Sequence, residues 1–298
     1  MTNLRITLAT PCLNAAATIE RTLDSVRAQA YPNLEYLILD GASNDHTLTI
    51  VDRYNDIVTR VASEKDKNIA DALNKGFRTA TGDVFGYINA DDTLAPGALA
   101  FVDAFFRENP EVDVITGGCR RVFADGSEVT TTPPADIRDV MTMRNCLEQP
   151  STFWRAAAHR KAGEFDDSYA LAFDWEYWNR LHAAGARFAT TDRPLSTYYF
   201  TDDNLTSRGG LRVIEEMERI TRAYAPNGPA LARAYRFIFN VYDMNGLYDV
   251  PFRQLPKLKQ AALAAGLAPL YALYGRRAIN AYNWNWASKQ IRGRVWHR

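Results

Sequence analysis

The amino-acid sequence predicts an α/β protein with a doubly wound, mostly parallel sheet flanked by helices and a helical C-terminal extension. Two observations lead to this prediction. Strand-like and helix-like segments alternate from the N-terminus to about residue 117, which is typical of a parallel sheet covered on both faces. From about residue 206 the pattern is helical, with an interruption at residues 226–229.

The alternating segments follow one another in a regular order. Apolar runs predict strands over residues 5–10, 34–40, 57–62, 84–88 and 112–116. Amphipathic spacing predicts helices after Asn14 as an N-cap, over 47–54, over 68–80 and from Pro96. Beyond Gly117 we expect a hairpin over 120–129 and an aromatic-rich helix over 173–184. We therefore expect an α/β domain at 1–205, with halves 1–117 and 118–205, and a helical region at 206–298.

Composition narrows the class of protein. The chain has 298 residues, 47% of them hydrophobic, which is enough to bury a full core. Lys+Arg and Asp+Glu each total 35, so the net charge is zero and a generic nucleic-acid binder is not expected. The charge is unevenly placed, because residues 251–298 contain nine Lys and Arg and no Asp or Glu. This asymmetry indicates two parts with different surroundings.

The N-terminus and the cysteines indicate a cytoplasmic protein. The chain passes directly into its first predicted strand without the charged and apolar regions of a signal peptide. Its longest apolar stretch, residues 261–274, is shorter than the ~20 residues that span a bilayer. Cys12, Cys119 and Cys146 are odd in number and lack metal-ligand spacing, so we expect reduced thiols.

Acidic residues follow two of the predicted strands. In open α/β sheets, ligands bind beyond the carboxyl ends of the strands, where Asp40 and the pair Asp91–Asp92 are expected. Adjacent carboxylates repel each other unless a cation or donors neutralise them, and hard oxygen ligands suit Mg²⁺ or Mn²⁺. The alternative is a solvated turn, since Asp is common in turns. Neither Gly-x-Gly-x-x-Gly nor a phosphate-loop motif occurs in the sequence.

Several short motifs together resemble the family 2 glycosyltransferases with the GT-A fold. The matching segments are residues 10–14, 40–47, 63–76, 80–83, 89–92, 149–153, 163–166 and 173–178. They occur in the family's order over roughly residues 4–200. Each is weak alone, and their order makes the resemblance specific. Leu13 departs from the family pattern, because Tyr is usual there.

The resemblance implies roles for residues on the donor side. Thr10 and Pro11 would line the nucleotide pocket, and Asp40 would contact the base or ribose. Asp66 and Lys67 fall in a segment that contacts the nucleotide. Asp91 and Asp92 fill the family's Asp-X-Asp-like site, with Asp91 on the nucleotide sugar and Asp92 as the direct ligand of Mg²⁺ or Mn²⁺.

On the acceptor side, the resemblance identifies Asp174 as the general base of an inverting reaction. Taken alone, an Asp at this place is more often a helix cap, and Glu176 is the reserve candidate for the base. The side chains expected to touch the acceptor are Gln149, Trp154, Trp175 and Glu176. Core packing is the alternative for each aromatic residue.

These features predict a metal-dependent inverting glycosyltransferase. We expect it to transfer a sugar from a UDP-linked donor to a saccharide or lipid-linked acceptor in polysaccharide or glycolipid biosynthesis. A nucleotidyltransferase is one alternative, but it would need a Gly-rich and basic loop after the first strand, and residues 11–17 contain no Gly, Arg or Lys. The other is a catalytically silent nucleotide-sugar-binding or scaffold protein, which would bind the donor without hydrolysis or transfer.

The basic segment at 251–298 combines its positive charge with Tyr and Trp residues. Such a segment can lie on an anionic membrane, which would make the protein peripheral on the cytoplasmic face. A helical cap on the acidic catalytic domain and a homodimer contact remain equally open. Nucleic-acid binding is not expected, because no recognition motif accompanies the charge.

Overall fold

The computed structural model describes residues 3–135, 137–143, 145–200 and 210–242, with a few scattered positions between 261 and 273. The chain forms two compact units. The first unit comprises residues 1–135, 147–173 and 180–200, and the second comprises 136–146, 174–179 and 201–298. The basic segment at 251–298 lies outside the described residues apart from those scattered positions.

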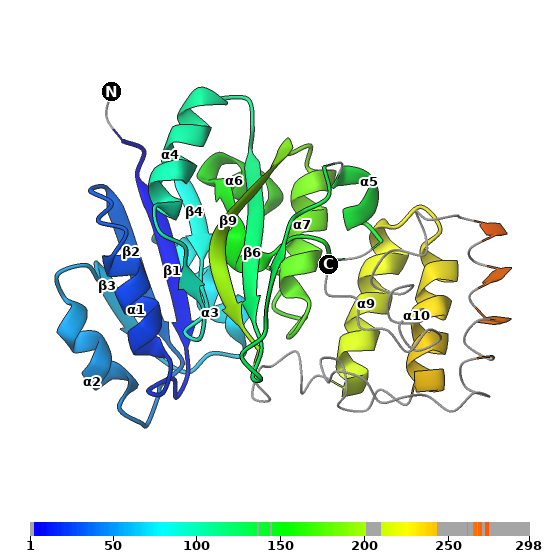
Figure 1. Cartoon of the computed structure of the whole chain (residues 1–298), viewed down its shortest axis with the longest axis horizontal. Helices are drawn as coiled ribbons and strands as arrows, with labels where there is room; N and C mark the ends of the chain where they lie inside the picture. The colour runs from blue at the N-terminus through cyan, green and yellow to red at the C-terminus, as the bar shows by residue number, and fades with distance from the viewer. Residues whose placement is uncertain are drawn as a thin grey trace. The chain divides into compact units, whose positions relative to one another are not determined.

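The first unit contains one mixed sheet, which has nine strands in the described part of the chain (Figure 1). Its order is β3 (Arg60–Ser63), β2 (Leu34–Asp40), β1 (Ile6–Cys12), β4 (Val84–Tyr87), β8 (Thr152–Arg155), β6 (Val114–Val122), β9 (Phe188–Tyr199) and β5 (Thr93–Leu94), with β7 (Glu128–Thr131) paired to β6. The four strands from β3 to β4 are parallel, as are β6 and β9. β8 is antiparallel to β4 and β6, and β5 and β7 also pair antiparallel.

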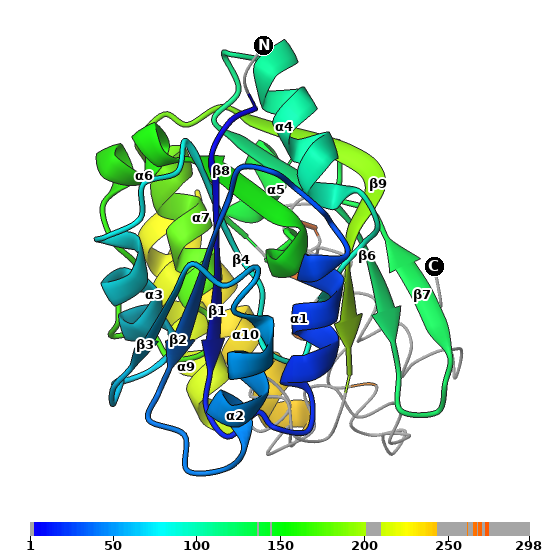
Figure 2. The ribbon, with the colours of Figure 1, turned by 90° about the vertical axis from the view of Figure 1, so that its left-hand side faces the viewer.

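Helices cover both faces of the sheet. They are α1 (Ile19–Arg27), α2 (Thr47–Val51) with a 3₁₀ turn at Asp52–Tyr54, α3 (Ile69–Phe77), α4 (Ala98–Glu108) and α6 (Ala156–Ala162). Figure 2 shows α3 and α6 on one side of β1–β4, and α1 and α4 on the other. This confirms the predicted doubly wound α/β fold.

Local sequence explains how α3 begins and packs. The side chain of Asn68 accepts a hydrogen bond from the backbone N–H of Asp71, so Asn68 is the N-cap. A Cβ at Gly76 would lie 2.7 Å from Cδ1 of Leu39, so a larger residue there would require the Leu39 side chain to shift where α3 packs against β2.

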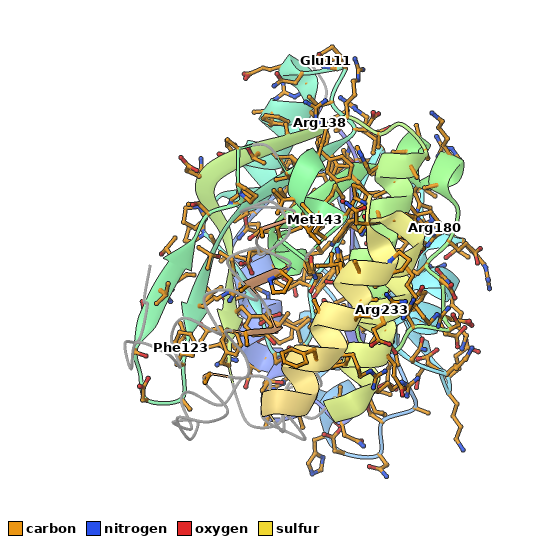
Figure 3. All side chains as sticks on the ribbon, turned by 90° about the vertical axis from the view of Figure 1, so that its right-hand side faces the viewer. Glu111, Phe123, Arg138, Met143, Arg180 and Arg233 are labelled. Carbon is orange, nitrogen blue, oxygen red and sulfur yellow. The ribbon has the colours of Figure 1, made fainter. Side chains whose placement is uncertain are left out.

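The structure corrects several predicted boundaries. The N-cap of α1 is Thr18 and not Asn14. Instead Asn14 has a positive φ of 50°, and its side-chain oxygen accepts a hydrogen bond from the backbone N–H of Asn44 at 2.9 Å. The strand expected over 112–116 continues to Val122 and forms the predicted hairpin with β7, next to which Phe123 is labelled in Figure 3.

The second unit is helical in its described residues. It contains α5 (Arg138–Met141), residues 174–179 of α7 (Phe173–Ala183), α9 (Gly210–Tyr224) and α10 (Gly228–Tyr242). α9 and α10 lie side by side and are joined through the predicted interruption (Figure 1). The Arg236 guanidinium pairs with the Glu218 carboxylate at 2.8 and 3.0 Å and links them, while Arg233 on α10 is exposed (Figure 3). Of the helices in the described ranges, none is both long enough and apolar enough to cross a membrane.

Candidate active site

The loops after β1 and β2 meet at the carboxyl edge of the parallel strands. Cys12 and Asp40 are register partners at the ends of these strands, and the Gly41 N–H donates to the Cys12 carbonyl at 2.8 Å. The Asn14 N–H also donates to Oγ of Ser43 at 2.8 Å. The structure therefore brings together two of the segments that the sequence assigned to nucleotide binding, at the edge where open α/β sheets bind ligands.

Three predicted nucleotide contacts are buried within the protein. Asp40 is 1% exposed, and its Oδ2 accepts hydrogen bonds from the Ser63 hydroxyl at 2.6 Å and the Ser43 N–H at 3.1 Å. Thr10 is fully buried, and its hydroxyl lies 2.9 Å from the Tyr36 hydroxyl. Pro11 is buried as well. These side chains stabilise the strand ends, and their contact with a nucleotide stays a prediction.

Asp66 lies in the loop after β3, beside the end of β2. A Cβ at Gly41 would lie 3.5 Å from both Oδ2 of Asp66 and Cδ1 of Leu13, so these two side chains lie next to Gly41. Leu13 is 62% exposed, which is unusual for a large apolar side chain. An apolar surface and a carboxylate thus lie close together at this edge, where the base of a nucleotide would need stacking and hydrogen bonding.

Lys75 pairs with the Asp66 carboxylate of this loop and with Asp71 at the start of α3. Nζ of Lys75 lies 2.7 Å from Oδ1 of Asp66 and 3.3 Å from Oδ2 of Asp71. Burial raises the pKa of Asp66. The hydrogen bond that Lys75 makes with Asp66 raises the pKa of Lys75. The predicted contact Lys67 instead extends to Asp167, with Nζ 2.9 Å from Oδ1, in an exposed ion pair.

Asp92 is a fully buried carboxylate with one unused oxygen. The turn after β4 is closed by its N–H, which donates to the Asn89 carbonyl at 3.1 Å. Its Oδ1 accepts a bond from the Tyr199 N–H at 3.3 Å, and its Oδ2 is buried without a hydrogen-bond partner among the described residues. Burial first, and then the charge of Asp91, raise the pKa of Asp92 well above its usual range. This oxygen is suited to a ligand that supplies positive charge.

Asp91 is partly exposed and is held by a residue that the sequence did not reveal. Its carbonyl accepts a hydrogen bond from Nη2 of Arg21 at 2.8 Å. The same guanidinium stacks 3.6 Å from the centre of the Tyr199 ring. Burial raises the pKa of the Asp91 carboxyl, and the Arg21 charge opposes that rise. Arg21 lies on the exposed face of an amphipathic helix, so only its contacts indicate a role.

Gln149 also reaches the end of β4. Its Nε2 donates to the Tyr87 carbonyl at 2.7 Å, and its Oε1 accepts a bond from Nδ2 of Asn89 at 3.3 Å. Trp154 behaves differently, because it is fully buried in β8 and packs edge-on against Phe77. The structure therefore corrects the expectation for Trp154, which belongs to the core and does not reach an acceptor.

In the second unit, Asp174 is a partly buried carboxylate in the first turn of α7. Its Oδ1 accepts a bond from the Trp175 N–H at 2.7 Å, and its Oδ2 accepts one from Nδ2 of Asn145 at 3.2 Å. The N-cap of α7 is Ala172. Asp174 is therefore not the helix cap that was the alternative to a catalytic base. Burial raises the pKa of Asp174 to about 6, which makes it a stronger base than an ordinary carboxylate.

The other two predicted acceptor residues are engaged within the second unit. Trp175 is 1% exposed, and its Nε1 donates to the Met141 carbonyl. Glu176 is also buried, and its Oε1 accepts a bond from the Tyr224 hydroxyl at 2.8 Å. Both side chains stabilise the helices, which leaves Asp174 as the better candidate base.

No group of three or more His, Cys, Asp or Glu side chains with metal-binding geometry occurs in the part of the chain that the structure describes. Mg²⁺ is commonly bound by one or two carboxylates together with substrate phosphates. Asp92, with Asp91 beside it, matches the protein contribution to such a shared site.

The geometry agrees with comparisons to known proteins. The family profile described as "Glycosyl transferase family 2" matches residues 7–160, more than half of the chain. A "PGL/p-HBAD biosynthesis glycosyltransferase" of Mycobacterium bovis is 28% identical over 171 residues, which cover 56% of this chain and 65% of that protein. A "Poly-beta-1,6-N-acetyl-D-glucosamine synthase" of Staphylococcus epidermidis is 30% identical over 111 residues, covering 37% and 27% respectively. The chain thus spans less than two thirds of the length of these relatives.

Solved structures with the same fold include two that hold a nucleotide sugar. S. aureus TarS 1-349 in complex with UDP-GlcNAc aligns with a TM-score of 0.62 at 16% identity, covering 98% of this chain and 93% of that one. The mannosyltransferase PcManGT from Pyrobaculum calidifontis, in complex with GDP-Man and Mn²⁺, aligns with a TM-score of 0.63 at 20% identity, covering 98% and 85%. With its fold, its strand-end acidic turn and its family profile in agreement, the chain belongs to glycosyl transferase family 2 and has the GT-A fold.

Proposed function

We propose that this protein is a metal-dependent inverting glycosyltransferase that moves a sugar from a UDP-linked donor to a saccharide or lipid-linked acceptor. The observation that carries the proposal is Oδ2 of Asp92, a buried carboxylate oxygen without a hydrogen-bond partner at the carboxyl end of β4. Donor and metal are also supported by similar proteins, since one neighbour binds UDP-GlcNAc and another binds GDP-Man with Mn²⁺. The acceptor class is supported by the names of two relatives, the PGL/p-HBAD biosynthesis glycosyltransferase and the poly-beta-1,6-N-acetyl-D-glucosamine synthase.

The residues at this turn fit a divalent cation. An uncompensated carboxylate in a buried position is costly, and a cation removes that cost. Asp92 would hold the ion, and Asp91 would add to the negative field around it. When bound, Mg²⁺ or Mn²⁺ would counter the charge that develops on the departing diphosphate.

The loops after β1, β2 and β3 are proposed to hold the nucleotide. Leu13 offers an exposed apolar surface beside Gly41, where the base would stack without the usual Tyr. Asp66 would accept a hydrogen bond from an N–H of the base. In this proposal Asp40 acts indirectly, because its hydrogen bond from Ser63 fixes the end of β2.

Asp174 is proposed as the general base. A hydroxyl group of the acceptor is a weak nucleophile until a carboxylate removes its proton. With a pKa of about 6, Asp174 is largely ionised at pH 7 and yet holds a proton more strongly than an ordinary Asp. One base and a single displacement invert the configuration at the anomeric carbon of the donor sugar.

A ligand panel tests the proposal. The melting temperature is measured with UDP-glucose, UDP-GlcNAc and GDP-mannose, each with Mn²⁺ or with EDTA, followed by assays of donor hydrolysis and sugar transfer. We expect a UDP-sugar with Mn²⁺ to raise the melting temperature, because a ligand that binds only the folded state stabilises it. Full activity in EDTA would contradict the metal role. Donor binding without hydrolysis or transfer would instead support a catalytically silent binding protein.

The basic segment at 251–298 needs a separate test. Binding to an anionic membrane predicts co-sedimentation with anionic liposomes that weakens as salt increases. Absence of such binding would favour a cap on the catalytic domain or a dimer contact, which size measurements in solution distinguish.

A further inference from the structure

Two side-chain amides form a short hydrogen-bonded chain at the end of β4. Nε2 of Gln149 donates to the backbone carbonyl of Tyr87 at 2.7 Å. Oε1 of Gln149 accepts a bond from Nδ2 of Asn89 at 3.3 Å. Tyr87 ends β4, and Asn89 begins the turn that carries Asp91 and Asp92. These hydrogen bonds therefore connect the last residue of β4 to the turn that carries Asp91 and Asp92.

The donor and acceptor groups of the two amides fix the orientation of each side chain in these hydrogen bonds. A backbone carbonyl only accepts hydrogen bonds, so Gln149 must turn its NH₂ group toward Tyr87. Its oxygen then faces Asn89, which must in turn present its own NH₂ group. The remaining polar atom of Asn89, Oδ1, is thereby directed away from Gln149 as an acceptor.

Oδ1 of Asn89 has no hydrogen-bond partner among the described residues, although it is buried. A buried acceptor without a donor is costly, so such atoms are few in folded proteins and require an explanation. This one lies next to the proposed donor site, because the Asp92 N–H donates to the backbone carbonyl of the same Asn89 at 3.1 Å. A ligand that supplies an O–H or N–H donor would remove the cost.

The order of the strands indicates which part of the donor lies there. β1 lies between β2 and β4 in the sheet. The proposed base contacts, Leu13 and Asp66, follow β1 and β3, whereas Asn89 follows β4. A nucleotide sugar with its base near β2 and its diphosphate near Asp92 would place its sugar, which carries several hydroxyl donors, toward the β4 turn.

We propose that the side-chain oxygen of Asn89 accepts a hydrogen bond from a hydroxyl group of the donor sugar, and that Gln149 is a positioning residue that holds Asn89 in this orientation. The proposal rests on the proposed function. It assigns donor-sugar selectivity to Asn89, and it gives Gln149 an indirect role in place of the acceptor contact expected from the sequence.

The test compares the full-length protein with its Asn89→Ala variant. The dissociation constants of UDP-glucose, UDP-GlcNAc and GDP-mannose, and of UDP and GDP, are measured by calorimetry with Mn²⁺. For the donor that the wild type binds, we expect Asn89→Ala to weaken binding of the nucleotide sugar by about three- to tenfold, which corresponds to one neutral hydrogen bond. Binding of the free diphosphate should change less than about twofold, because it lacks the sugar.

Two further variants make the test specific. Gln149→Leu has a side chain of similar size without an amide, so Asn89 is free to turn over, and we expect a smaller loss in the same direction. Asn33→Ala is the matched control, because the Asn33 side-chain amide donates to the Asn3 carbonyl at 2.9 Å, ahead of β2 at the opposite end of that strand. It should leave the ratio of the two dissociation constants unchanged.

The outcomes separate this inference from the proposed function. If the wild type binds a nucleotide sugar and Asn89→Ala keeps the wild-type ratio, the inference is wrong and the proposed function stands. Equal losses for nucleotide sugar and free diphosphate would assign Asn89 to the metal or phosphates, which also overturns it. If the wild type binds no nucleotide sugar, both fail. Should Asn89→Ala not fold by circular dichroism, the ratio measured for Gln149→Leu decides by the same criteria.

Discussion

Two acidic turns at one edge of the sheet differ in how their carboxylates are satisfied. Asp40 ends β2 and Asp92 follows β4, and both are almost completely buried, at 1% and 0% exposure. Asp40 accepts hydrogen bonds from the Ser43 N–H and the Ser63 hydroxyl. Asp92 accepts one long bond from the Tyr199 N–H on Oδ1, and its Oδ2 has no partner in the described structure.

From this difference we propose that Asp40 is a structural carboxylate and that Asp92 is a ligand-binding one. The donors around Asp40 compensate its charge within the chain, so the residue stabilises the loops without any ligand. Around Asp92 the compensation is incomplete, and burial raises its pKa well above the usual range. In this proposal the same residue type has two different roles at equivalent strand ends, and the following experiments test that division.

The largest effect is expected at Asp92. The Asp92→Asn variant keeps the shape of the side chain but loses the charge that would hold the metal, so we expect activity to fall on the order of 10⁴-fold. Its melting temperature should not decrease, because no charge-assisted bond to Oδ2 is lost. Turnover is measured with saturating donor and a titration of Mn²⁺. Near-normal turnover at ordinary Mn²⁺ concentrations would place Asp92 with Asp40 as a structural residue.

Replacing the proposed base comes next. We expect Asp174→Asn to lower turnover on the order of 10³-fold while leaving donor binding unchanged, because only proton removal from the acceptor is lost. Glu176→Gln is the control, since its carboxylate is engaged by the Tyr224 hydroxyl within the second unit. Turnover of Asp174→Asn close to that of the wild type would rule out the assignment. A collapse in Glu176→Gln alone would transfer the base role to Glu176.

At Asp40 the expected effect is on stability. Asp40→Ala leaves the Ser43 N–H and the Ser63 hydroxyl without their acceptor, so we expect a loss of about 2 kcal/mol in the free energy of unfolding. Ser63→Ala, which removes one donor, should cost about 1 kcal/mol. Urea unfolding measures both losses. Turnover per folded molecule should stay within about tenfold of wild type, and a loss as large as that of Asp92→Asn would give Asp40 a direct role in catalysis.

The sequence predicted the parallel half of the sheet because its signals are local. The runs that became β1, β2 and β4 are continuous and apolar, and Asn68 lies where a cap of α3 belongs. The shorter elements lack such signals. β5 has two residues and β8 has four, while β9 contains Asp192, Arg193 and Pro194, which argue against a strand.

The difference between the two acidic turns could not be predicted from the local sequence pattern, because the hydrogen-bond donors come from distant residues. Ser63 lies 23 residues after Asp40, and the N–H that reaches Asp92 belongs to Tyr199, 107 residues away. Whether a carboxylate is satisfied depends on which strands become neighbours, and that is set by the whole sheet. The same applies to Trp154, which the antiparallel pairing of β8 with both β4 and β6 places in the core.

The smallest expected effect concerns the pH dependence of stability at Asp174. Its pKa is about 6 in the folded protein and near 3.8 in the unfolded chain, so the folded state binds more protons between these values. The contribution of Asp174 to stability should therefore fall as pH rises from about 4 to 6, by about 1–2 kcal/mol after allowance for partial exposure. Asp174→Asn lacks this loss, so its melting temperature should exceed that of wild type by about 2–4 °C at pH 8 and match it near pH 4. Parallel wild-type and variant curves across this range would mean that Asp174 is not perturbed by burial, and that its strength as a base has another origin.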